Sequence, residues 1–177
     1  MDIFLEELMS GLPDTRELVR VMIRLIAATL LGAIVGIERE RAGKPAGLRT
    51  HILVTLGTTV FVVACSGVGM SLDSISRVIQ GIATGIGFIG AGAILKLNEE
   101  RDIQGLTTAA SIWMTAAVGV AVGLGSLGVA LLSTLLTLVI LSSVGSLEYR
   151  IGKGRAAKAE DSHQRADARN DRDRDVT

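Results

Sequence analysis

The chain has 177 residues, 49% of them hydrophobic, and its 18 basic side chains balance 18 acidic ones. This balance argues against a nucleic-acid partner, and a single cysteine excludes an internal disulfide. The charges are unevenly placed, because residues 103–147 contain none and eight of the basic side chains lie in residues 150–177. Apolar runs of this length exclude an ordinary soluble globule.

Four runs with few or no charges are long enough to form membrane-spanning helices. They cover residues 18–37, 52–72, 78–95 and 103–147. The fourth run would be ~68 Å long as one helix, more than twice a hydrocarbon core of roughly 30 Å. It therefore folds back, and the Gly-Leu-Gly-Ser-Leu-Gly sequence near its middle favours a turn between spans at about 106–123 and 127–147. The sequence predicts an all-α membrane protein, a compact bundle of five transmembrane helices.

The distribution of basic residues predicts how these spans are oriented. Five spans place the two termini on opposite sides of the membrane. Fourteen basic residues fall on the side of the C-terminus, whereas four fall on the other, namely Arg16, Arg20, Arg24 and Arg77. The positive-inside rule then predicts that the N-terminus lies outside and the C-terminus in the cytoplasm.

The segments that flank the spans are expected to differ in kind. Residues 1–17 are predicted to be a periplasmic leader, either a short interfacial helix or a loosely ordered segment. Residues 18–147 form the five-span domain. Residues 148–177 are polar and alternate in charge, so they cannot bury enough apolar surface to fold and are predicted to be a disordered cytoplasmic tail.

A polar stripe marks the start of the third span. Its members are spaced 4, 3 and 4 residues apart and share one face of a helix: Asp73, Arg77, Gln80 and Thr84. One interpretation is a water-filled vestibule or ligand site, because polar groups inside a membrane often mark sites. The other is an interfacial ion pair between Asp73 and Arg77 with a buried hydrogen bond between helices. The sequence leaves both open.

Small and hydroxyl residues recur at helical spacing within the spans. Glycines expected to pack helices closely are Gly81, Gly85, Gly87, Gly90, Gly92 and Gly119. The Gly-x-Gly-x-x-Gly match inside the third span is not a nucleotide motif, because no strand precedes it. Hydroxyl stripes lie on the other spans, at Thr55, Thr59 and Ser66, at Thr108, Ser111 and Thr115, and at Ser126, Ser133 and Thr137. They are interpreted as contacts between helices, with a polar path as the alternative.

The segment between the first two spans is the most charged stretch near the membrane. Arg39, Lys44 and Arg49 are placed to meet lipid phosphates, and Glu38 and Arg39 are alternatively placed to pair inside the mouth of the bundle. His51 begins the second span. Because histidine titrates near neutral pH, a pH-sensing role is one interpretation and a solvated interfacial residue the other.

No catalytic set is evident, so the chain is not predicted to be an enzyme, and no cofactor is expected. Neither histidine has metalloprotease or Cys/His spacing, and Cys65 is interpreted as a small core residue. A metal site stays undetermined. Carboxylates that could meet Mg²⁺ at the membrane edges are Glu38, Asp73, Glu99, Glu100 and Asp102.

Three segments extend the interpretation: GIERERAGKPAGLRTHILVTLG (36–57), SRVIQGIATGIGFIGAGAIL (76–95) and GLTTAASIWMTAAVGVAVGLG (105–125). Together they resemble the membrane domain of the MgtC/SapB family over roughly residues 20–147. The resemblance implies a bacterial inner-membrane protein tied to growth in low Mg²⁺ and to virulence, acting on membrane partners such as the ATP synthase or a sensor. In this chain the polar signature that it implies is Glu38, Arg39, Lys44, Arg49, Thr50 and His51, then Arg77 and Gln80, then Thr107 and Thr108.

The chain departs from the family pattern at two places. Ser74 stands where family members usually have a proline before the third span. Many members also carry a cytoplasmic ACT-like domain after the last span, whereas this chain has 28 polar residues there, so it resembles the short, membrane-only branch. The resemblance thus implies a non-enzymatic regulator of Mg²⁺ or ion homeostasis, and the glycine faces allow a homodimer as one state of assembly. The alternative is a small transporter or channel along the third span.

Overall fold

The computed structural model describes residues 14–67, 69–96 and 103–143. The chain divides into two units, Met1–Leu138 and Val139–Thr177. All the long helices belong to the first unit. The predicted leader, the tail and the last four residues of the fifth span lie outside the described residues.

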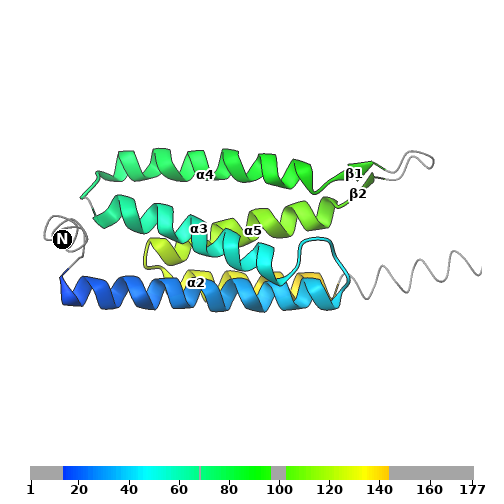
Figure 1. The fold of residues 1–177 in the computed structure, drawn as a ribbon, viewed down its shortest axis with the longest axis horizontal. Coiled ribbons are helices and arrows are strands. Elements are labelled where there is room, and N and C mark those ends of the chain that lie inside the picture. Colours follow the sequence, from blue (N-terminus) through cyan, green and yellow to red (C-terminus); the bar gives the residue numbers. More distant parts are fainter. Residues whose placement is uncertain (1–13, 68, 97–102, 144–177) are drawn as a thin grey trace, which may run out of the picture. The chain divides into compact units, whose positions relative to one another are not determined.

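Helices make up nearly all of the described chain (Figure 1). In order, the elements are α2 (Thr15–Arg41), α3 (Leu48–Gly67), α4 (Leu72–Gly92), β1 (Leu95–Lys96), β2 (Ile103–Gln104), α5 (Leu106–Gly123) and a further helix, Leu127–Ser143. The first four helices named are each long and apolar enough to cross a membrane, and Leu127–Ser143 is a shorter apolar helix. The prediction of an all-α, multi-pass membrane fold is confirmed.

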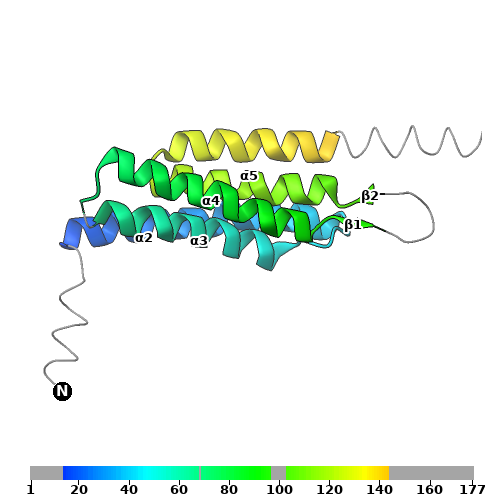
Figure 2. The same ribbon diagram turned by 90° about the horizontal axis from the view of Figure 1, so that it is seen from above.

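Successive helices run in opposite directions and lie side by side (Figures 1 and 2). One end of this arrangement therefore holds the end of α2, the start of α3, the end of α4 and the start of α5. We call it the basic end, because it carries the charged segment 38–51. The two strands, which the sequence did not predict, pair there as a two-residue antiparallel ladder between α4 and α5.

Local signals set the helix boundaries. Gly43, at a φ of +66°, ends α2, and the amide of Lys44 donates to the Arg39 carbonyl at 3.0 Å, as in a Schellman cap. Ser71 caps α4 by accepting the amide of Ser74 at 3.3 Å. The predicted bounds 52–72 and 78–95 were therefore wrong. The α3 helix already ends at Gly67, and α4 begins six residues earlier than hydropathy suggested because its first turn is polar.

The packed interior combines alanines with a few branched apolar residues, and many large apolar side chains point outward. One core cluster contains Ala28, Leu31, Val118, Val122 and Ala130, and a second contains Ala46, Ile86, Ile112 and Ala116. Exposed positions include Leu30, Phe61, Phe88 and Leu135. This inverted pattern is typical of helices that face lipid, where small residues allow backbones to approach closely.

Candidate functional site

A seam of buried polar side chains runs between α3 and α5. On α3 it contains His51, Thr55, Thr58 and Thr59, and on α5 it contains Thr108, Ser111 and Thr115. Spacings of three and four residues place each set on one face of its helix, so the two sets face each other. We call these seven residues the polar seam.

Most hydroxyls of the polar seam are satisfied within their own helix. Thr55 donates to the His51 carbonyl, and Thr115 donates to the Ser111 carbonyl at 2.8 Å. Thr59 differs, because its Oγ1 donates across to the Gly119 carbonyl of α5 at 2.8 Å. In the part of the chain that the structure describes, no buried side-chain nitrogen or oxygen lacks a partner. The seam therefore leaves few donors for a ligand, and the bond of Thr59 joins α3 to α5.

Glycines of α2 and α5 close the space around the seam. A Cβ on Gly119 would overlap Thr58 Oγ1 and lie 3.0 Å from Thr55 Cα, and a Cβ on Gly36 would lie 2.6 Å from Leu48 Cα. A Cβ on Gly32 would likewise overlap Thr55 Oγ1. At these positions α3 therefore lies directly against the backbones of α2 and α5.

His51 is the one titratable ring in the polar seam and is 0% exposed. Its Nδ1 lies 2.9 Å from the Gly47 carbonyl, and its Nε2 lies 3.3 Å from Ser111 Oγ. A carbonyl only accepts, so Nδ1 carries a hydrogen. Ser111 Oγ also lies 2.8 Å from the Thr108 carbonyl. Its hydroxyl can turn to Nε2 when the ring is neutral and to Thr108 when the ring is charged. The interpretation of His51 as a solvated interfacial residue was wrong.

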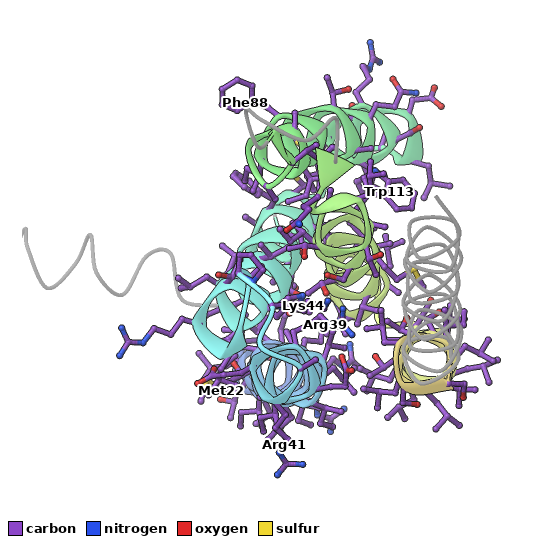
Figure 3. All side chains as sticks on the ribbon, turned by 90° about the vertical axis from the view of Figure 1, so that its right-hand side faces the viewer. Met22, Arg39, Arg41, Lys44, Phe88 and Trp113 are labelled. Atoms are coloured by element: carbon purple, nitrogen blue, oxygen red, sulfur yellow. The ribbon has the colours of Figure 1, made fainter. Side chains whose placement is uncertain are left out.

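At the basic end, Arg39 and Glu38 form a two-point ion pair. Arg39 Nε lies 2.5 Å from Glu38 Oε2, and Nη2 lies 2.9 Å from Oε1. Arg39 is 3% exposed. The interpretation in which it pairs with Glu38 is therefore confirmed, and the one in which it meets lipid phosphates is not. In the end-on view of Figure 3, Arg39 and Lys44 lie over the middle of the helix ends, whereas Arg41 points away. The ion pair with Glu38 offsets part of the cost of removing the Arg39 guanidinium from water.

The other residues singled out at this end are spread around it. Lys44 and Arg49 are exposed, Thr50 is half-buried, and Thr107 is exposed at the start of α5, beside the buried Thr108. Glu40, which the sequence did not single out, accepts the amide of Leu48 at 3.0 Å. This bond satisfies the first backbone N–H of α3, which has no partner within the helix. The structure therefore brings together Glu38 with Arg39 and His51 with Ser111, but it does not gather the whole signature into one pocket.

The polar stripe of the third span faces outward on α4. Asp73, Arg77, Gln80 and Thr84 are all exposed, and Thr84 donates to the Gln80 carbonyl at 2.9 Å. Among the described residues, neither the expected Asp73–Arg77 ion pair nor a buried bond from Gln80 to another helix is present. The isoleucines of α4 occupy its inner face instead, where Ile86 is buried against α5.

Two of the six glycines singled out in the sequence lie close to another helix. Gly119 packs on α3, and a Cβ on Gly90 would lie 3.6 Å from Ala109 Cβ. The other four have open space around them: Gly81, Gly85, Gly87 and Gly92. Packing of those four against a partner stays a prediction.

Three close contacts had no signal strong enough to single them out in the sequence. Gly32 and Gly36 lie in an ordinary apolar run, and spacing by four gives only a weak hint of close packing. Arg24 donates from Nη1 to the Gly123 carbonyl at 2.8 Å and caps the end of α5. In the sequence, Arg24 counted only as a charge near the membrane edge.

Comparison with known proteins places this geometry in a family. Residues 25–150 match the model of the MgtC family. SrpB of Synechococcus elongatus is 43% identical over 136 residues, which are 71% of this chain and 75% of SrpB. YhiD of Escherichia coli K12, named as a candidate magnesium transporter, is 41% identical over 138 residues, 73% of this chain and 63% of YhiD.

A third relative is longer than the region it shares. MgtC of Salmonella typhimurium is 44% identical over 117 residues, which are 66% of this chain and 49% of MgtC. The chain thus spans less than two thirds of YhiD and about half of MgtC. No solved structure matches it. The match of one family model to most of the chain, together with these relatives, shows that the chain belongs to the MgtC family.

Proposed function

We propose that this chain is a non-enzymatic membrane regulator linked to Mg²⁺ and ion homeostasis, and that it acts by binding a membrane protein. The observation that carries the proposal is the closed interior. Thr55 and Thr58 lie against Gly119, and Gly32 lies against Thr55, so α3 packs tightly on both α2 and α5 at these positions. This close packing supports a chain that acts through its surface.

The surface offers a groove between α3 and α4 that suits an apolar partner. Its volume is about 650 Å³. Leu53 and Phe61 line it from α3, and Val78, Gly81 and Gly85 line it from α4. Glycines on one wall let another helix approach closely. The resemblance names the rotary ATP synthase or a membrane sensor as the partner class, and we keep this as part of the proposal.

The orientation belongs to the same proposal. The basic end carries Arg39, Arg41, Lys44 and Arg49, and we place it at the cytoplasmic face of the bacterial inner membrane. The start of α2 then lies on the outer side, with the N-terminus outside and the C-terminus in the cytoplasm. The paired Arg39 contributes to the topology signal even though lipid does not reach it.

A second candidate function, a small ion transporter, has one observation in its favour: the name of its relative YhiD. Its proposed path follows Arg77 and Gln80 on α4, and these residues face away from α3 and α5. No described helix covers these two residues, so an ion path along them would be open to lipid on its outer side. The regulator is therefore the better-supported function.

Flux measurements on purified protein in liposomes separate the two functions. The regulator predicts no flux of Mg²⁺, Na⁺ or H⁺ above empty liposomes under any gradient. Flux that Gln80→Leu abolishes while the exposed control Leu53→Ala leaves it intact would establish the transporter instead. Crosslinking in native membranes, followed by identification of the captured protein, then tests the partner class. Capture of no membrane protein would contradict the proposed regulator.

A further inference from the structure

The outer face of α4 carries a regular stripe that the function above does not use. Its residues are Asp73, Arg77, Gln80, Thr84, Gly87 and Ala91, which we call the α4 stripe. They are spaced 4, 3, 4, 3 and 4 apart, and all six are exposed. Figure 3 shows Phe88, which adjoins the stripe and is 86% exposed, pointing away from α3 and α5. In the described chain, nothing covers this side of α4.

Lipid chains cannot form hydrogen bonds with the side chains in the polar half of the α4 stripe. Gln80 lies eight residues into α4, about 12 Å from its start at 1.5 Å per residue, and so within the hydrocarbon layer. Its amide makes no hydrogen bond to the described part of the chain. A carboxamide left unpaired in hydrocarbon costs several kcal/mol. The stripe therefore needs a protein partner at this depth.

The chemistry of the α4 stripe is complementary to itself. All copies of the chain insert in the same direction, so a two-fold axis normal to the membrane brings two α4 helices together in parallel. Each residue then faces its own equivalent at the same height, and Asp73 reaches Arg77 of the second copy diagonally, about 6 Å along the axis; by symmetry Arg77 reaches Asp73. A carboxamide is both donor and acceptor, so the two Gln80 side chains can pair. Within the described chain, Asp73 and Arg77 have no other ion-pair partner.

The spacing of the stripe also fits a second helix of the same kind. Repeats of 3.5 residues keep a seam in register when two helices cross left-handedly at about 20°. Gly87 and Ala91 continue the seam with small residues, and a Cβ on Gly87 would meet nothing within 4 Å. We propose that the α4 stripe is the interface of a parallel homodimer of this chain, with Asp73–Arg77 pairs at one end and Gly87 at the close approach.

Disulfide crosslinking in native membranes tests the interface directly. In a Cys65→Ala background, Thr84→Cys and Ala91→Cys each place one thiol on the stripe, and a lipid-permeable oxidant is added. Ala83→Cys is the matched control, because Ala83 is also exposed but lies about 100° around the helix from Thr84. We expect dimers from both stripe positions and little from Ala83. Equal yields from Thr84→Cys and Ala83→Cys would overturn the proposal, as would a Thr84 adduct with a different protein.

Charge exchange tests the pairing without relying on a loss of folding. In the Thr84→Cys protein, Asp73→Arg and Arg77→Asp singly should each lower the dimer yield at least about fivefold, because all four charges of the cluster then have the same sign. The double exchange restores opposite charges and should recover the yield. Both residues are exposed in the single chain, so these changes leave its core unaltered. Single exchanges without effect, or a double exchange no better than the singles, would refute the reciprocal pairs.

Discussion

Gly119→Ala tests whether close backbone contact seals the interior. The added Cβ would overlap Thr58 Oγ1 and lie 3.0 Å from Thr55 Cα, where carbon atoms normally sit 3.5–4.0 Å apart. Backbone atoms cannot rotate away, so α3 has to shift. Overpacking of this kind costs about 1–3 kcal/mol. The shift also strains the bond from Thr59 to the Gly119 carbonyl, which contributes about 1 kcal/mol.

The helical propensity of alanine works against this loss. It returns about 1 kcal/mol per glycine replaced in a helix interior, so the net destabilisation of Gly119→Ala should be about 1–3 kcal/mol. Gly81→Ala is the matched control, because a Cβ there would meet nothing within 4 Å. It should leave stability unchanged or raise it by up to about 1 kcal/mol. The free energy of unfolding is measured by denaturant titration in detergent micelles. If Gly119→Ala is no less stable than Gly81→Ala, the close-contact argument fails.

Two further changes address the basic end. Ser111→Ala removes the partner of His51 Nε2 and should cost about 1–3 kcal/mol in the same titration, whereas the exposed Thr107→Ala should change stability by less than about 0.5 kcal/mol; equal effects would show that the buried bond contributes nothing. Gly105→Ala places a Cβ against the Ala93 carbonyl at a φ of +95°, so it should lower stability by more than about 1 kcal/mol, and an unaltered midpoint would contradict the turn geometry.

Hydropathy was sufficient to predict the helices but not their exact ends. Long uncharged runs have few alternatives to membrane helices, so the all-α fold followed directly. The start of α4 was missed because its first two turns contain Asp73 and Arg77, which lower hydropathy although Ser71 caps the helix before them. A cap is a local hydrogen bond, and a sliding average of hydrophobicity does not register it.

The direction in which each helix faces was harder to predict. Spacing showed that Gln80 and Thr84 share a face, but α4 has glycine or isoleucine on its other faces too, and each of those can pack. Only the fit against α5, where Ile86 is buried, decides which face turns inward. The Arg39–Glu38 pair was among the expected alternatives because the two residues are adjacent at a span edge. The contact of Arg24 with Gly123 joins residues 99 apart, and no local pattern encodes it.

Water accessibility of a cysteine placed in the polar seam tests the closed interior most directly. In the Cys65→Ala background, Thr115→Cys carries a thiol on the buried face of α5, and Thr107→Cys carries one at its exposed start. A membrane-impermeant maleimide is applied to vesicles of either orientation. We predict that Thr107→Cys reacts from one side, whereas Thr115→Cys reacts from neither until the protein is denatured. Labelling of Thr115→Cys in the folded protein, with protection by Mg²⁺, would contradict the closed interior and favour a path for ions.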